Sequence, residues 1–354
     1  MKNYVIMAKM LIIFIAILII VLCSFYRYEI RPVNKDIGNI TFQVNEGDTW
    51  YSIADRLYEA NLIHSVKFYK LYIKLFTPSN LEIGVYNVSP SMDLPKLMDV
   101  LEHEATNPNI ISITFKEGIN MRTVANLIAD NTVNTYDDVM NTLSDTEYID
   151  SLIKDYWFIT DDIKNANIYY PLEGYLFPST YKIDSTKDVK TIFKSMLDQM
   201  DIELSKYKLN IEASGYTVHQ LLTLASIVEL EAGNATDRAS VAGVFYNRIK
   251  NKWQLGSDVT TYYALKIDDF KTSLTKKQLA TCNKYNTRAT CFTGLPVGPI
   301  ANPSIESIAA AIIPTETNMY YFVADCSGKT YLTKTLAEHN KIIAQLEKEN
   351  NWCQ

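Results

Sequence analysis

A run of uncharged, mostly apolar residues near the N-terminus constrains this chain more than any other feature. It extends from Met10 to Tyr26, MLIIFIAILIIVLCSFY, and follows Lys9. At about 1.5 Å per residue, a helix of this length crosses most of a hydrocarbon core of about 30 Å. A cleaved signal peptide is the alternative, but the run ends without the small residues of a cleavage site. A lipid-modified Cys23 is disfavoured because the bulky Leu22 precedes it. We therefore predict a retained transmembrane helix over 10–26.

Basic residues flank this run on both sides, so the positive-inside rule gives only a weak orientation. The short tail 1–9 leaves the large C-terminal part as the segment to be translocated. We therefore expect residues 1–9 in the cytoplasm, a linker over 27–39, and the remainder outside the cell membrane.

Composition excludes several classes of function. The chain has 354 residues and a formal net charge of -6, which fits two to three domains and gives no electrostatic footprint for nucleic acid. The four histidines are scattered and no CxxC occurs, so we expect neither a metal site nor a cofactor. Outside the cell, a bridge between the nearby Cys282 and Cys291 is expected, whereas the pairing of Cys326 and Cys353 stays open.

One local pattern occurs twice, about 71 residues apart. A strand is predicted over Ile40–Val44 and again over Ile111–Phe115. Each is followed by a Glu-Gly turn, at 46–47 and 117–118, and by apolar residues at helical spacing. We interpret these segments as two related strand–turn–helix units.

The first unit continues with a helix (Val66–Phe76), a strand (Gly84–Val88) and a helix (Leu94–Glu104). This strand–helix–helix–strand order resembles a LysM domain, a small peptidoglycan-binding module. The alternative is a packing subdomain without glycan contact. We assign 40–105 to this LysM-like subdomain.

Residues 106–354 read as a second, larger domain. Helical spacing occurs over Tyr136–Leu152 and Ile192–Tyr207, and a helix pair starts near Leu221 and Arg238. Strands at Tyr320–Ala324 and Thr330–Leu332 and a helix over Leu336–Asn350 close the chain. The fold class is therefore predicted to be α+β.

Two glutamates stand out in the apolar helical run that begins at Leu221. Glu229 and Glu231 lie two residues apart, about 200° around a helix, so they cannot face one cleft in the same way. Apolar surroundings disfavour the charged form of a carboxyl group, so such a group can carry a proton at neutral pH. Spacing does not choose between the two. The alternative is one exposed carboxylate and one ion pair with Arg238 or Arg248.

Several motifs resemble the endolytic murein transglycosylase (MltG, YceG-like) family. They include EGYLFPSTY from Glu173, ASIVELEAG from Ala225, DRASVAGVFYNRI from Asp237, QLGSDVTTYYAL from Gln254 and KYNTRATCFTGLPVGP from Lys284. The likeness covers about residues 40–350. It implies a lyase that cleaves within peptidoglycan strands and leaves 1,6-anhydro-N-acetylmuramic ends, at the plasma membrane and in company with peptidoglycan synthases.

The resemblance also implies roles for individual residues. Glu231 matches the catalytic acid/base, and Glu229 is expected to support it through like-charge repulsion. The residues expected to line the glycan groove are Glu173, Asn247, Arg248, Ser257, Asp258, Tyr285, Asn286 and Thr287. The family has a proline where this chain has Val259, and Cys282 and Cys291 match no family requirement.

Other interpretations of these residues remain open. Arg248 could form an ion pair with Glu229 or Asp237, Asp258 could cap a helix, and Tyr285 and Asn286 could be turn formers. His339 is interpreted as a capping or packing residue rather than a catalytic one.

Two rival functions are considered. A hydrolytic muramidase would use Asp258 or Glu173 to activate water, because ordinary glycosidases need two carboxyl groups. A non-catalytic wall-binding scaffold would not depend on Glu231.

Overall fold

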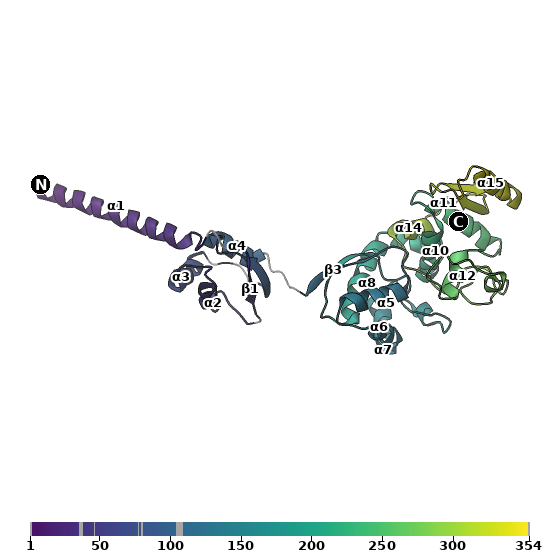
Figure 1. Cartoon of the computed structure of the whole chain (residues 1–354), viewed down its shortest axis with the longest axis horizontal. Coiled ribbons are helices and arrows are strands. Elements are labelled where there is room, and N and C mark those ends of the chain that lie inside the picture. The colour runs from purple at the N-terminus through teal and green to yellow at the C-terminus, as the bar shows by residue number, and fades with distance from the viewer. Residues whose placement is uncertain are drawn as a thin grey trace. The chain divides into compact units, whose positions relative to one another are not determined.

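The computed structural model describes residues 2–34, 38–45, 47–76, 78, 81–103 and 109–352. The chain forms two compact units, Met1–Ile110 and Ile111–Gln354 (Figure 1). Both mix helices with two-stranded sheets, so the predicted α+β class is confirmed.

The N-terminal helix α1 extends over Lys2–Ile30. Its segment Lys9–Ile30 has a mean hydropathy of 2.7 and is long enough to cross a membrane. The helix continues four residues past the expected span, into the predicted linker, and ends just before Arg31-Pro32. Proline disfavours helical geometry in the residue before it, which explains this end point.

The first unit contains the predicted strand–helix–helix–strand order, and its likeness to LysM stays a prediction. Strand β1 pairs antiparallel with β2, Ile40 opposite Val88. Alternate strand residues such as Phe42 and Tyr86 point into the core, as the period of a strand requires. The elements are β1 (Ile40–Val44), α2 (Ala54–Glu59), α3 (Val66–Phe76), β2 (Gly84–Val88) and α4 (Leu94–His103).

The second unit begins with a strand, β3, that is hydrogen-bonded to β4. The single helix expected over Tyr136–Leu152 is two helices, because the Asp145 carboxylate caps a new N-terminus by accepting from the N–H groups of Glu147 and Tyr148. The elements of this half are β3 (Ile110–Phe115), α5 (Met121–Asn131), α6 (Tyr136–Ser144), α7 (Thr146–Asp155), the 3-10 helix η1 (Asp161–Lys164), β4 (Ser179–Asp184), α8 (Val189–Ser205) and α9 (Lys208–Ser214).

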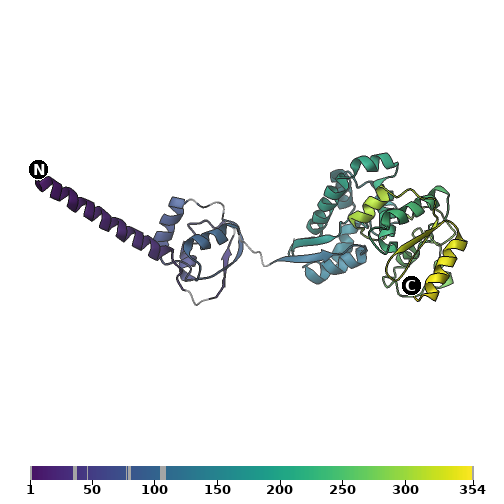
Figure 2. The ribbon, with the colours of Figure 1, turned by 90° about the horizontal axis from the view of Figure 1, so that it is seen from above.

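Helix α10 forms the centre of the second half. It starts at a capping box between Thr217 and Gln220, and α11 and α14 pack along it (Figures 1 and 2). Every residue from Leu221 to Val228 is buried, so the middle of the helix presents no polar group to solvent and its last turn carries both glutamates. The elements are α10 (Val218–Glu231), α11 (Arg238–Lys250), α12 (Asp258–Ala264), α13 (Lys276–Leu279), α14 (Ile305–Ile312), β5 (Tyr321–Ala324), β6 (Thr330–Thr333) and α15 (Leu336–Lys348).

The two related turns differ in their surroundings. Gly47 and Gly118 both have positive φ, +84° and +77°. Gly47 has open space where a side chain would stand, whereas a Cβ on Gly118 would lie 3.2 Å from Leu230 of α10. The second turn is therefore fitted against the helix that carries both glutamates.

Candidate active site

A cavity of about 730 Å³ opens at the C-terminal end of α10. Its volume falls within the usual range for small-molecule sites. The lining residues come from α10, α11, the loop before α12, β5 and α15. They are Glu231, Phe245, Arg248, Trp253, Gln254, Leu255, Gly256, Ser257, Asp258, Arg288, Tyr321, Phe322, Leu336 and His339.

Glu231 is the last residue of α10 and lines this cavity. The Ser257 hydroxyl donates to its Oε1 at 2.5 Å. Burial raises the pKa of Glu231, and the negative charge of Asp258 acts in the same direction. The Ser257 hydrogen bond and the positive charges of Arg248 and Arg288 lower this pKa, but burial outweighs them. The group can therefore hold a proton that an ordinary glutamate would have released.

Glu229 points to a different set of partners and does not line the cavity. Its Oε1 accepts from Nη2 of Arg238 at 2.8 Å, and its Oε2 accepts from the N–H of Ser304 at 2.9 Å and from the Ser304 hydroxyl at 2.5 Å. These contacts join α10 to the starts of α11 and α14. The expected ion pair with Arg238 is confirmed for Glu229. The largest effects of charge on the Glu231 pKa come from Asp258, Arg248 and Arg288, and the expected repulsion from Glu229 stays a prediction.

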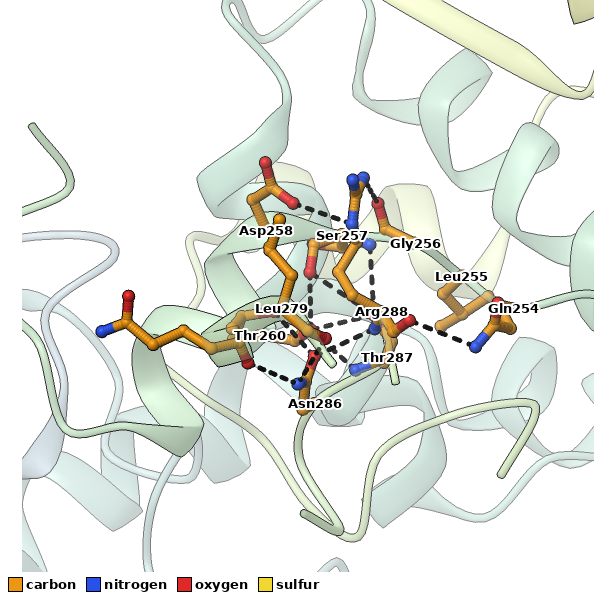
Figure 3. A network of polar contacts seen from close by, with 12 residues as sticks. Gln254, Leu255, Gly256, Ser257, Asp258, Thr260, Leu279, Asn286, Thr287 and Arg288 are labelled. Atoms are coloured by element: carbon orange, nitrogen blue, oxygen red, sulfur yellow. Dashed lines mark hydrogen bonds and ion pairs between the residues drawn. The ribbon is translucent and has the colours of Figure 1, made fainter. Parts of the chain in front are cut away.

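The loop that carries Ser257 is held by Thr287 (Figure 3). Thr287 accepts from the Gly256 N–H through its carbonyl and from the Ser257 N–H through its hydroxyl, both at 3.1 Å. Its own N–H donates to the Thr260 hydroxyl at 3.0 Å. Thr287 is buried and lies behind the cavity, so it positions Ser257 instead of lining the groove.

Tyr285 and Asn286 are also buried. The Asn286 amide donates to the carbonyl of Thr281 at 2.8 Å and accepts from the Thr261 hydroxyl at 2.7 Å. The Tyr285 hydroxyl accepts from the Tyr169 N–H at 3.2 Å. The expectation that residues 285–287 line the groove is therefore corrected: they shape the loop behind it.

A disulfide brackets this segment. Cys282 and Cys291 are bonded, with their Cα atoms 5.9 Å apart, so the expected bridge is confirmed. Cys326 is also disulfide-bonded, and the predicted involvement of Cys353 falls outside the described residues.

The end of α11 supplies Asn247 and Arg248. The Asn247 amide donates to the carbonyls of Thr317 and Met319 at 2.8 and 2.9 Å, so it fixes the segment before β5 and does not line the cavity. Arg248 does line it, and donates to the carbonyls of Tyr320 and Leu255. The alternative of an ion pair between Arg248 and Glu229 or Asp237 is therefore replaced by carbonyl contacts.

Asp258 begins α12, with Ser257 at the N-cap position. Its side chain is 54% exposed and forms an ion pair with Arg288, Nε to Oδ1 at 3.1 Å (Figure 3). Arg288 also donates from Nη1 to the Gly256 carbonyl at 3.1 Å. Arg288 was not expected from the sequence, although it directly follows the Tyr-Asn-Thr segment.

Glu173 lies away from the cavity and is 1% exposed. Its two carboxyl oxygens accept from the Met121 N–H, each at 3.0 Å, and Oε2 also accepts from the Tyr263 hydroxyl at 2.8 Å. Burial raises its pKa to about 7. Its predicted place in the groove is therefore wrong, because it ties the start of α5 to α12.

An aromatic wall, defined as Trp253, Tyr321, Phe322 and His339, lines the cavity and was not predicted as part of the site. The Trp253 ring is 42% exposed and lies 6.2 Å from that of Tyr321. His339 packs on Tyr321 with ring centroids 5.5 Å apart, as its expected packing role requires. The Tyr-Tyr-Phe run at residues 320–322 was the sequence feature that could have indicated this wall.

No group of three or more His, Cys, Asp or Glu side chains that could hold a metal ion occurs in the part of the chain that the structure describes.

Comparisons with known proteins agree with this architecture. A profile of the YceG-like family matches residues 42–345. The chain is 36% identical over 315 residues to an endolytic murein transglycosylase of Bacillus subtilis, covering 88% of this chain and 86% of that protein. The chain is also 30% identical over 321 residues to an endolytic murein transglycosylase of Streptococcus pneumoniae D39. This alignment covers 86% of this chain and 58% of the streptococcal protein.

A solved structure is also similar. The crystal structure of a putative yceG-like protein from Listeria monocytogenes has a TM-score of 0.61 at 33% identity, over 87% of this chain and 100% of that one. The fold is thus that of a known class. The chain belongs to the YceG-like family.

Proposed function

We propose that this protein is a membrane-anchored endolytic lytic transglycosylase of peptidoglycan. The names of its curated relatives support cleavage of murein. One observation carries the assignment to a site: Glu231 is a carboxyl group with a raised pKa that lines a cavity of about 730 Å³ and is held by one neutral donor.

The proposed reaction uses this glutamate twice. Protonated Glu231 donates its proton to the glycosidic oxygen between N-acetylmuramic acid and N-acetylglucosamine, and the C1–O bond breaks. The carboxylate then takes the proton of the muramic 6-hydroxyl, whose oxygen bonds to C1 and closes the 1,6-anhydro ring. No water is consumed. The Ser257 hydrogen bond fixes Oε1 of Glu231, and among the described residues none donates to Oε2, which is free to meet the substrate.

The environment of Asp258 supports this reaction over hydrolysis. Hydrolytic glycosidases generally need a second carboxyl group to activate water or to attack the sugar. Asp258 lines the cavity but is held by Arg288. Glu173, the other candidate, is buried behind Tyr263 and Met121. A muramidase would therefore have to use Asp258 while its Oδ1 is paired with Arg288.

The rest of the assignment concerns location and partners. The apolar helix α1 would anchor the chain in the cell membrane, with the second unit outside. There it would meet nascent glycan strands and end their elongation beside peptidoglycan synthases. If the first unit resembles a LysM domain in function as well as in the order of its elements, it would contribute contacts to the glycan strand.

The test is the chemistry of the product ends. Purified peptidoglycan is digested with the full chain in detergent, in water enriched in heavy oxygen, and the fragments are analysed by mass spectrometry. A transglycosylase gives fragments that are lighter by one water and carry no heavy oxygen. Reducing ends that carry the isotope would identify a muramidase. Absence of cleavage on both mature and newly polymerised strands would favour the scaffold.

A further inference from the structure

One face of helix α3 is exposed although it carries large apolar side chains. Leu71, Leu75 and Phe76 are 51%, 68% and 58% exposed. Lys67 and Lys74 are exposed among them. Positions 67, 71, 74 and 75 lie three and four residues apart, so they share one side of the helix. The opposite side, with Tyr69 and Ile73, is buried in the core of the first unit. The α3 face, defined as residues 67, 71, 74 and 75, is therefore apolar and basic together, whereas Phe76 at the helix end packs on Tyr72 with ring centroids 4.5 Å apart.

Aromatic contacts place α3 beside the end of the apolar helix α1. The Phe68 ring lies 5.8 Å from that of Phe25 and 6.0 Å from that of Tyr26. Close by, Tyr28 packs on His64 at 5.0 Å and lies under the guanidinium of Arg31 at 4.3 Å. Figure 1 shows α3 next to this end of α1. Aromatic and basic residues at the end of an apolar span are typical of a membrane–water interface. Helix α3 therefore begins at the level where the span leaves the hydrocarbon.

The chemistry of the α3 face fits a lipid surface better than a second protein chain. Leucine with lysine on one helix side is typical of helices that lie in the interface. Lysine is depleted at protein–protein interfaces, whereas an anionic lipid surface attracts it.

We propose that α3 is an interfacial helix that lies on the phospholipid bilayer next to the span. Leu71 and Leu75 insert between the lipid headgroups, and Lys67 and Lys74 contact anionic headgroups. The first unit is then held against the bilayer by two elements, α1 and α3. This inference rests on the proposed membrane anchoring by α1.

The test uses the full chain in vesicles, with an environment-sensitive fluorescent amino acid placed at position 71. The matched control carries the same probe at Thr41, an exposed position of β1. Vesicles contain phosphatidylcholine with or without phosphatidylglycerol. Quenching by bromine-labelled lipids reports contact with the bilayer, and quenching by iodide reports contact with water.

A probe at position 71 is expected to be quenched by brominated lipid several-fold more than the probe at position 41, at a depth of about 5–10 Å. Substituting Lys67→Gln and Lys74→Gln should reduce this quenching in phosphatidylglycerol vesicles only.

Three results would overturn the proposal. If the chain floats with the vesicles and iodide quenches both probes equally, the anchor holds but α3 lies in water. A blue-shifted probe at position 71 that neither quencher reaches would mean a protein partner, such as a second copy. A chain that does not float with the vesicles would reject the anchor and this inference together.

Discussion

The last turn of α10 carries two glutamates, Glu229 and Glu231, whose polar surroundings differ in charge and in the number of hydrogen-bond donors. On one side, Glu229 meets Arg238 and two donors from Ser304. On the other, Glu231 meets one serine hydroxyl at the wall of a cavity, with its pKa raised by burial. The two residues are neighbours in sequence, but the 100° turn per residue sends them to different surroundings.

The comparison teaches that burial alone does not make a catalytic acid. A buried carboxylate that has a cation and enough donors is stabilised as the charged form and becomes a structural tie. One that keeps a single neutral donor is available for proton transfer. The same Glu→Gln change should therefore have opposite consequences at positions 229 and 231.

The largest expected effect is on catalysis by Glu231→Gln. Loss of a general acid/base costs about 10²- to 10⁴-fold in rate, so cleavage of peptidoglycan should fall by at least this range. Release of soluble muropeptides measures the rate. Glu212→Gln, at an exposed position of α9, is the matched control.

The same variant should fold at least as well as the natural chain at neutral pH. The folded pKa of Glu231 lies above the unfolded value, so its ionisation opposes folding as pH rises through the two values. A lowered unfolding midpoint for Glu231→Gln would mean that this residue is a structural tie like Glu229.

The second effect is on stability, through Glu229→Gln. The change removes the nearer of the two carboxylate partners of the mostly buried Arg238, the other being Glu306 at 3.9 Å. Breaking a buried pair in this way costs about 3–5 kcal/mol of unfolding free energy. Urea unfolding followed by tryptophan fluorescence measures it. The exposed pair between Lys164 and Asp150 gives the control, because Asp150→Asn should change stability by less than about 1 kcal/mol. Equal losses for both variants would remove the distinction between the two regions.

A smaller effect concerns pH. Glu231 acts first as an acid, so cleavage is present below its raised pKa and is lost as pH rises through it. The Ser257 hydroxyl lowers this pKa by stabilising the carboxylate. Ser257→Ala should therefore move the alkaline limb of the kcat/KM profile to higher pH. A limb that stays in place, or moves to lower pH, would mean that Ser257 does not act on the titrating group.

The smallest expected effect is on stability and concerns the glycines of the two related turns. Gly118→Ala should destabilise the second unit more than Gly47→Ala destabilises the first, although both glycines have positive φ. Both changes strain the backbone by about 1 kcal/mol, and the Gly118 change adds crowding against Leu230. Thermal unfolding of each variant is the measurement, and equal effects would show that Leu230 can move aside.

The sequence predicted the regular elements well where local signals were strong. The bounds of β1, α3 and β2 agree with the structure, because alternation and helical spacing are local properties. The break at Asp145 was missed because a capping carboxylate competes with a continuing apolar pattern. The extension of α1 to Ile30 was missed because a polar residue does not end a helix, whereas Pro32 does.

The site was predicted less completely. Glu231, Arg248, Ser257 and Asp258 line one cavity, as the resemblance suggested. A motif cannot tell whether its polar side chain meets a substrate or the protein's own backbone, and Asn286 is an example of the second kind. The aromatic wall depends on contacts between β5, α15 and Trp253 just after α11, which are far apart in sequence, so the Tyr-Tyr-Phe run alone could not place it at the cavity.

The most direct measurement sets Glu231→Gln beside Glu229→Gln in one peptidoglycan digestion, with the amounts of folded protein matched. Anhydro-ended fragments should disappear with Glu231→Gln and persist with Glu229→Gln. Anhydro ends from Glu231→Gln, at a rate near that of the natural chain, would contradict the claim that Glu231 transfers the proton.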